Sequence, residues 1–278
     1  MAAPPIAKLR ELEYASLAIE KDDSIDSADY LLWLNLLLSP GSSLGGVRPK
    51  ANVIDTNNEL WIAKFPSNAD DKDIGGWETV TYELALRSGI NMSPSYAQKF
   101  NSNQHTFLTK RFDRIRQDRI HFASAMTLLG YTDGTDAQDG VSYLQLAEFI
   151  MQQGCNVEQD LEELWRRILF NVCVANTDDH LRNHGFILQE NGWKLSPAYD
   201  LNPNENGTGL KLNINEAENA LEIDLVMEVA PYFRVPNTQA NTIKNKVIET
   251  VKDWRKIAAE VNIPRSEQEV ISTAFKVS

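Results

Sequence analysis

Cysteine is scarce in this sequence, because the 278 residues include only Cys155 and Cys173. Two cysteines at this spacing make neither a set of zinc ligands nor a disulfide framework. Thiols stay reduced in the cytoplasm, whereas small secreted domains often depend on several disulfides. We therefore expect a cytoplasmic protein with free thiols.

Long hydrophobic runs are also missing. The longest one, Leu31–Leu38, is interrupted by Asn35 and falls well short of the ~20 apolar residues that a membrane-spanning helix needs. The first residues, MAAPPIAKLRELEYA, contain no apolar core of a signal peptide. The sequence therefore predicts no membrane association.

Positive charge is in deficit, with 27 Lys and Arg against 39 Asp and Glu and a net charge of −12. Proteins that bind nucleic acid through its phosphates need clustered Lys and Arg, so we expect no direct nucleic-acid contact. Hydrophobic residues at 42% and charged residues at 24% are ordinary for a globular protein. The length fits one two-lobed domain or two small ones.

The most informative stretch is Asn171–Asp200. It contains Asp178, then Asn183 five positions later, then Asp200. This order is typical of a phosphoryl-transfer site, where one Asp orients the acceptor hydroxyl while an Asn and a second Asp hold Mg²⁺. The apolar runs GFIL and WKLS flank Asn191-Gly192, which predicts a β-hairpin that brings Asn183 close to Asp200.

The N-terminal part predicts a helix at Ile6–Ile19, a second at Ala28–Leu38, and then the glycine-rich loop PGSSLGGVRPKA, which contains Ser43, Gly45 and Gly46. Paired strands are expected at Val47–Ile54 and Leu60–Phe65. Backbone N–H groups of such a loop can bind phosphate, although Gly and Ser are common in any loop.

Lys64 ends the second of these strands, and Glu78 falls in the first turn of a helix expected at Trp77–Ser88. Singly, each has an ordinary explanation: Lys64 as a solvent-facing edge lysine and Glu78 as a favourable charge near a helix start. The order of glycine-rich loop, strand Lys and helix Glu favours an ATP site in which Lys64 contacts the phosphates and pairs with Glu78.

A further hairpin is expected from Tyr96–Phe100 and Thr106–Lys110, followed by Lys110, Arg111, Phe112 and Asp113. In a kinase the backbone of such a connection contacts the adenine, and Asp113 would contact the ribose. A solvated charge cluster explains these residues equally well.

Helical patterns dominate after His121, and Thr132–Gly140 is expected to be a solvated loop, since it lacks the closing glutamate of a calcium-binding EF-hand loop. A short strand is expected at Leu210–Ile214. The predicted helices are Tyr143–Gln153, Glu158–Ala175, Leu221–Val229, Asn237–Val261 and Ser266–Phe275.

Taken together and in this order, the motifs of the sequence resemble those of the HipA-like toxin serine/threonine kinases of bacterial toxin–antitoxin modules. The residues that carry the resemblance are PGSSLGGVRPKA, IAKFP, Glu78, TKRFDR, NTDDHLRNHGF and LSPAYDLNP. It implies a two-lobed, protein-kinase-like α+β fold that binds ATP and Mg²⁺. The N-lobe is expected at residues 1–112 and the helical C-lobe at 113–278.

By position, the resemblance makes Asp178 the catalytic aspartate and Asn183 and Asp200 the Mg²⁺ ligands, with His180 ordering the loop and Thr109–Asp113 contacting adenine and ribose. It also implies autophosphorylation at Ser43, with Ser42 as a neighbouring candidate. Both serines have a simpler explanation as turn formers. Phosphorylation would add negative charge beside a phosphate site and repel nucleotide.

The family further implies protein substrates, of which aminoacyl-tRNA synthetases are the known type, and a helix-turn-helix antitoxin as partner. Longer members carry an additional N-terminal subdomain. This sequence resembles the short form, in which that subdomain is expected to be a separate small protein.

Three alternatives stay open. Besides a protein kinase, the sequence is compatible with a catalytically silent, nucleotide-binding interaction module, with a small-molecule kinase that has the same Asp-to-Asn spacing, and with a metal hydrolase that uses Asp178, Asp179, His180 and His184. The last lacks a glutamate after the first His and an evident third ligand.

Overall fold

The computed structural model describes residues 3–20, 48–115 and 118–277. They form two compact units, the first made of Met1–Thr79 and Ser93–Arg119 and the second of Val80–Met92 and Ile120–Ser278. The single boundary expected after residue 112 differs from this division, because residues 80–92 associate with the C-terminal helices. The predicted helix Ala28–Leu38 and the loop residues Ser42, Ser43, Gly45 and Gly46 lie outside the described residues.

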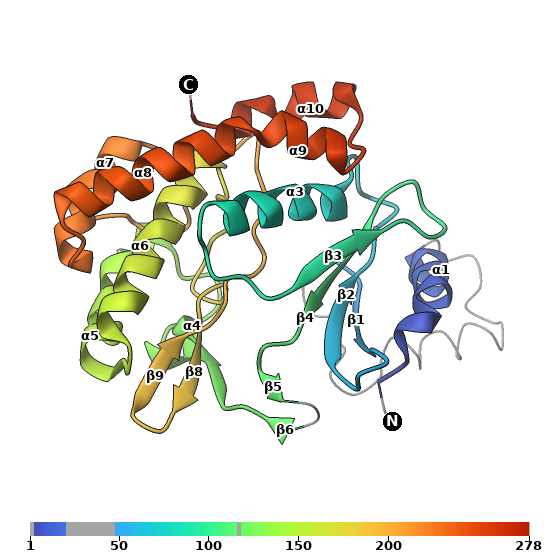
Figure 1. Cartoon of the computed structure of the whole chain (residues 1–278), viewed down its shortest axis with the longest axis horizontal. Coiled ribbons are helices and arrows are strands. Elements are labelled where there is room, and N and C mark those ends of the chain that lie inside the picture. Colours follow the sequence, from blue (N-terminus) through green and yellow to red (C-terminus); the bar gives the residue numbers. More distant parts are fainter. Residues whose placement is uncertain (1–2, 21–47, 116–117, 278) are drawn as a thin grey trace. The chain divides into compact units, whose positions relative to one another are not determined.

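The first unit is built around an antiparallel sheet in the order β1-β2-β4-β3 (Figure 1). Its registers pair Ala51 with Ala63 and Ser95 with Thr109, which confirms both hairpins expected from the sequence. The bounds are η1 Ile6–Lys8, α1 Leu9–Glu20, β1 Lys50–Ile54, β2 Leu60–Lys64, β3 Ser95–Gln98, β4 Thr106–Lys110, β5 Arg114–Ile115 and β6 Asp118–Arg119, with α3 Ile74–Arg87 shared between the units.

Helix α1 packs on this sheet through its apolar face, as the periodicity of Ile6–Ile19 predicts. Leu9, Leu12 and Ala15 join one buried cluster with the inward-facing residues of β1, β2 and β4. The same face contains a fully buried carboxylate, Glu13. It accepts the backbone N–H of Asn101 at 2.8 Å and the hydroxyl of Thr106 at 2.5 Å, so α1 is also held to the β3–β4 hairpin by polar contacts.

Helix α3 begins three residues earlier than expected, at Ile74, so Glu78 lies in its second turn rather than its first. Gly75 and Gly76 are poor helix formers, so the sequence pattern did not indicate a helix before Trp77. Gly75 is required by packing, because a Cβ there would lie 2.1 Å from the carbonyl oxygen of His105. The helix is capped by Asp73, which accepts the N–H of Gly76 at 2.9 Å.

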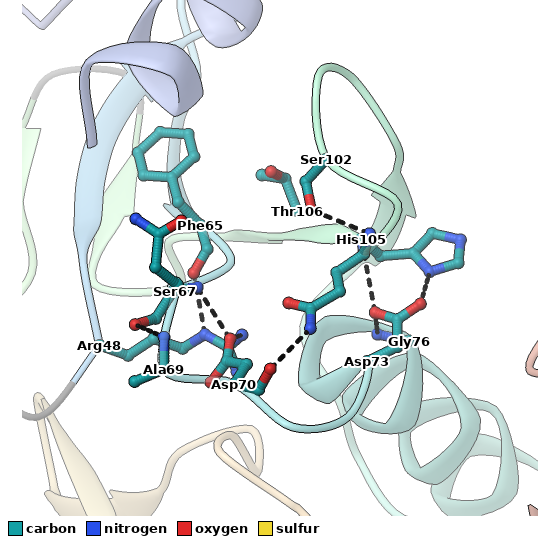
Figure 2. Close-up of polar contacts among 12 residues, drawn as sticks. Arg48, Phe65, Ser67, Ala69, Asp70, Asp73, Gly76, Ser102, His105 and Thr106 are labelled. Atoms are coloured by element: carbon teal, nitrogen blue, oxygen red, sulfur yellow. Dashed lines mark hydrogen bonds and ion pairs between the residues drawn. The ribbon is translucent and has the colours of Figure 1, made fainter. Parts of the chain in front are cut away.

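The Asp73 carboxylate also holds the end of the β3–β4 loop (Figure 2). It accepts the backbone N–H of His105 at 2.8 Å and contacts the His105 ring Nδ1 at 2.5 Å. Burial acts to raise the pKa of Asp73, but the hydrogen bonds and charge of His105 outweigh it, and the pKa is lowered from 3.8. One buried carboxylate thus links the start of α3 to the sheet.

We expect Asp73→Ala to lower the free energy of unfolding by about 3 kcal/mol, because it removes a helix cap and leaves the buried groups of His105 without their hydrogen-bond acceptor. Urea denaturation followed by circular dichroism measures the change. The exposed neighbour Asp71 provides the control, and Asp71→Ala should change stability by less than ~0.5 kcal/mol. Equal effects of the two substitutions would contradict the role given to Asp73.

The second unit is mainly helical and carries the three-stranded antiparallel sheet β7-β8-β9. Its elements are β7 Phe122–Ser124, α4 Ala125–Leu128, η2 Ala137–Asp139, α5 Tyr143–Gln153, α6 Val157–Cys173, β8 Gly185–Gln189, β9 Gly192–Leu195, α7 Ile223–Val229, η3 Ala230–Phe233, α8 Asn237–Lys252, α9 Trp254–Glu260, α10 Arg265–Ile271 and η4 Ser272–Ala274.

Helix α6 is the centre of this unit and is packed by α5, α7 and α8 (Figure 1). Its residues from Leu164 to Cys173 are buried with the exception of Arg166. Trp165 adds a hydrogen bond from its indole N–H to the carbonyl of Val226 at 2.9 Å. The long apolar helix predicted from the sequence is confirmed, and it gives the loop that follows it a rigid base.

Three local expectations were wrong. Phe122–Ser124 forms a strand paired with β8 before α4 begins. Leu210–Ile214 forms a single isolated bridge, between Asn213 and Ser142. The helix expected at Asn237–Val261 is broken at Asp253, and the Trp254 ring that follows stacks on Phe275 with ring centroids 4.2 Å apart. Each outcome depends on contacts that are distant in sequence.

Within the described residues, none of the helices combines the length and apolar character required to cross a bilayer.

Candidate functional site

The loop that follows α6 contains Asp178 and Asn183, and we call residues 176–184 the Asp178 loop. The chain leaves α6 at Ala175, which is fully buried and has the left-handed φ of +47°. Such a conformation costs a residue with a side chain about 1 kcal/mol or more and tends to occur at functional sites. The N–H of Asn176 bonds the Asn171 carbonyl at 2.9 Å, which fixes the turn.

Asp179 is the buried anchor of this loop. Its Oδ2 accepts hydrogen bonds from the Tyr143 hydroxyl at 2.6 Å and the Asn171 side chain at 2.8 Å, and it lies 2.9 Å from Nε2 of His184. Burial alone would raise the pKa of Asp179, but the charge and hydrogen bond of His184 and the Tyr143 hydroxyl outweigh it. The pKa is therefore lowered from 3.8, and the carboxylate is held ionised.

Asp178, in contrast, is exposed. Its backbone carbonyl, rather than its carboxylate, holds the loop: it accepts the Asn183 side-chain N–H at 3.1 Å and the His180 backbone N–H at 3.0 Å. The Asn183 side chain is 8% exposed. Because its Nδ2 is engaged, its Oδ1 is the atom left to contact a ligand.

The hairpin predicted between Asn183 and Asp200 is confirmed as β8 and β9, with Gly192 in the turn at φ +135°. Beyond the hairpin, the Tyr199 hydroxyl donates to the Arg182 carbonyl at 2.6 Å. This bond joins the chain neighbours of Asn183 and Asp200. Asp200 itself is exposed and has the left-handed φ of +62°.

We expect Asp179→Asn to destabilise the protein by about 3 kcal/mol at neutral pH. The substitution removes the buried negative charge that the side chains around Asp179 contact. Since the folded pKa of Asp179 lies below 3.8, its contribution is complete above that value and is lost as the pH falls through the folded pKa. The difference in the free energy of unfolding between wild type and variant should therefore become smaller in acid. Urea midpoints at neutral and acidic pH measure it, with Asp133→Asn as an exposed control; a pH-independent gap would contradict this account.

In the first unit, Lys64 and Glu78 form the pair that the sequence predicts. The Lys64 Nζ lies 2.5 Å from Glu78 Oε1, and the side chains are 14% and 5% exposed. The pair connects β2 to α3. An ion pair this well buried persists only with good geometry, so it fixes the orientation of the lysine.

The connection Lys110–Asp113 contains a second charged cluster. Arg111 binds the Asp113 carboxylate through both Nε and Nη2, at 2.8 and 2.6 Å, and Arg114 also contacts it. Burial opposes ionisation of Asp113, but the two arginines outweigh it and lower the pKa from 3.8. Lys110 pairs with Glu59 at 2.6 Å. A ribose hydroxyl would have to share Asp113 with these arginines.

His180, which the resemblance expects to order the loop, also lies in it and bonds through its backbone to Asp178 and Asn183. Its Nε2 lies 3.2 Å from the Arg182 guanidinium, and its Nδ1 is buried with no hydrogen-bond partner among the described residues. Asp179 and His184 also hold the loop through their side-chain contacts. No local signal distinguishes Asp178 from Asp179, because the partner that decides between them, Tyr143, lies 36 positions from Asp179.

The metal-hydrolase alternative gains no support from the geometry. In the part of the chain that the structure describes, no group of three or more His, Cys, Asp or Glu side chains lies close enough to hold a metal ion. Nε2 of His184 is committed to Asp179.

Comparisons with known proteins agree on one family. The HipA-like C-terminal domain matches residues 42–261. A Haemophilus influenzae protein named "Putative kinase" is 31% identical over 58% of this chain and 52% of its own length. The Shewanella oneidensis serine/threonine-protein kinase toxin HipA is 25% identical over 58% of this chain and 43% of its own length. The chain thus spans about half the length of these relatives.

Solved structures extend the likeness to the fold. The Shewanella oneidensis HipA, solved with HipB and operator DNA, matches 84% of this chain and 63% of its own, with a TM-score of 0.64 and 19% identity. The Helicobacter pylori proinflammatory kinase CtkA matches 81% of this chain and 92% of its own, with a TM-score of 0.52 and 12% identity. The fold is a two-lobed, kinase-like α+β fold, and the chain belongs to the HipA-like C-terminal domain family.

Proposed function

We propose that the chain is an ATP- and Mg²⁺-dependent serine/threonine protein kinase. The observation that carries this proposal is the contact between the Asp178 loop and the segment ending in Asp200. Tyr199 bonds Arg182, and Asn183 bonds the Asp178 carbonyl. A side-chain contact thus joins the two segments that carry Asp178, Asn183 and Asp200, and this contact supports the proposal.

The residues present fit a magnesium ion. Asn183 would offer its amide oxygen and Asp200 a carboxylate, and Mg²⁺ prefers oxygen ligands. Mg²⁺ usually retains several waters and binds through one or two carboxylates plus substrate phosphates, so two protein ligands are sufficient. Mg²⁺ bound there would neutralise charge on the transferring phosphoryl group.

Asp178 would orient the acceptor hydroxyl and accept its proton, for which its exposed carboxylate is suited. The backbone of the same residue holds Asn183, so the base and the metal ligand are positioned together. Lys64, oriented by Glu78, would contact the nucleotide phosphates. Lys110–Asp113 would contact adenine and ribose through its backbone and through Asp113.

We also propose a role as the toxin of a toxin–antitoxin module, with a helix-turn-helix antitoxin and a separate small protein as partners. The support is the match to the HipA toxin and to its complex with HipB and DNA. An aminoacyl-tRNA synthetase is the proposed type of substrate. With a net charge of −12, the chain itself is unsuited to DNA, which the antitoxin would contact.

Autophosphorylation at Ser43, or at the adjacent Ser42, is the proposed off-switch. Mass spectrometry of the protein incubated with MgATP, before and after phosphatase treatment, tests activity and site together. We expect one added phosphate on a peptide that contains these serines. Nucleotide binding without any transfer, to the protein itself or to added substrates, would instead identify a silent interaction module.

A further inference from the structure

A pocket opens beside the exposed carboxylate of Asp178. We call it the Asp178 pocket; it is lined by Thr132–Asp136, Asp178, His180–Arg182, Met126 and Lys211. Its volume is about 210 Å³, below the ~300 Å³ at which sites for drug-sized ligands begin. It is therefore too small for a nucleotide and suits one side chain of an acceptor.

A second depression adjoins the first, because both are lined by Asp136 and Lys211. We call it the Asn204 groove; it has a volume of about 380 Å³ and is lined by Asp136–Gln138, Thr177, Asn204, Asn206–Lys211 and Asn219. A small molecule held at Asp178 would leave it empty. A polypeptide chain that passes Asp178 in an extended conformation would fill it.

One wall of the Asn204 groove is fixed to the Asp178 loop. The N–H of Asn204 bonds the Ala175 carbonyl at 3.1 Å, and its side chain bonds the Thr177 hydroxyl at 2.7 Å. Gly207 packs so closely that a Cβ would lie 2.4 Å from Cγ2 of Thr177. The groove is thus held at a fixed distance from Asp178, as a subsite for residues flanking an acceptor must be.

The opposite wall is fixed as well. The N–H of Ala137 bonds the Lys211 carbonyl at 2.8 Å, and the Asn213 side chain donates to the Ala137 carbonyl at 2.9 Å. Three exposed, uncharged polar side chains then line the groove, namely Gln138, Asn206 and Thr208, together with the exposed Lys211. Amides and hydroxyls offer both donors and acceptors, which complements the alternating N–H and C=O groups of an extended backbone.

We propose that the Asn204 groove binds the extended segment on one side of the phosphorylated Ser or Thr, with Gln138, Asn206 and Thr208 as the residues that contact its backbone. This inference rests on the proposed kinase activity. It predicts that residues on one side of the acceptor raise kcat/KM, and that this effect does not depend on their side chains.

The experiment compares a short capped peptide with serine at its centre to the same peptide extended with randomised residues on its amino or its carboxyl side. Wild type should show a kcat/KM about tenfold higher for one of the two extensions, the gain that a few backbone hydrogen bonds supply. Two variants should lose this gain because their KM for the extended peptide is higher. They are Thr208→Trp, which fills the groove, and the double variant Gln138→Ala with Asn206→Ala. The rate on the short peptide and nucleotide binding should be unchanged.

Thr242→Trp and Asn245→Ala, at exposed positions of α8, are the matched controls and should retain the full gain. Equal gains in the groove variants and wild type would overturn the proposal, as would transfer to the protein itself with none to any peptide. If wild type transfers phosphate to no acceptor at all, the proposed kinase function itself is wrong.

Discussion

Asp178→Asn should reduce phosphoryl transfer by about 10²–10⁴-fold, the usual contribution of a positioned base, and leave nucleotide affinity within about twofold. Asn has the shape of Asp but cannot take the proton of the acceptor hydroxyl. Because the Asp178 side chain is exposed and its backbone carbonyl makes the contact with Asn183, the substitution leaves the loop intact. Transfer from labelled ATP and a nucleotide-binding titration measure the two quantities.

The control for this result is Glu190→Gln in the exposed turn of the β8–β9 hairpin, which removes the same charge and should retain full activity. Asp179→Asn provides a contrast, since it should lose stability as well as activity. If Asp178→Asn continues to transfer phosphate at the wild-type rate, the assignment of Asp178 as the catalytic aspartate is wrong.

Asp200→Asn should lose the Mg²⁺ dependence of nucleotide binding and reduce transfer on the order of 10³-fold, because several kcal/mol of charge stabilisation by the metal would be lost. The choice of Asn matters here. Asp200 has a φ of +62°, and Asn adopts this conformation more readily than most residues, so the backbone is preserved while the charge is removed. Titration of nucleotide with and without Mg²⁺ measures the effect.

Asp200→Ala tests the backbone contribution separately, because Ala is strained at positive φ. We expect it to be as inactive as Asp200→Asn and less stable by about 1 kcal/mol. Retained Mg²⁺ dependence in both variants would remove Asp200 from the metal site.

Local patterns were sufficient to predict much of this fold. Asn191-Gly192 between two apolar runs predicted the β8–β9 hairpin, and the periodicity of Glu158–Ala175 predicted α6, which begins one residue earlier at Val157. Both signals act between neighbours in sequence. The hairpin then allowed Asp178, Asn183 and Asp200 to be considered as parts of one site, because it turns the chain back towards the end of the Asp178 loop.

Features that depend on distant contacts were missed. Gly75 interrupts the helical pattern of α3 because the helix approaches His105, and β7 exists because it pairs with β8. The same holds for the site: Asp179 is buried by Tyr143 and His184, while Asp178 remains exposed. Nothing in the local sequence Asp-Asp-His indicates which of the two aspartates is buried and which is exposed.

The most direct test is a crystal structure of the protein with Mg²⁺ and a non-hydrolysable ATP analogue. We predict one Mg²⁺ about 2.0–2.1 Å from both the Asn183 Oδ1 and an Asp200 carboxylate oxygen, with the γ-phosphate beside Asp178 and Lys64 on the phosphates. A triphosphate bound elsewhere, or a metal that contacts neither Asn183 nor Asp200, would contradict this account.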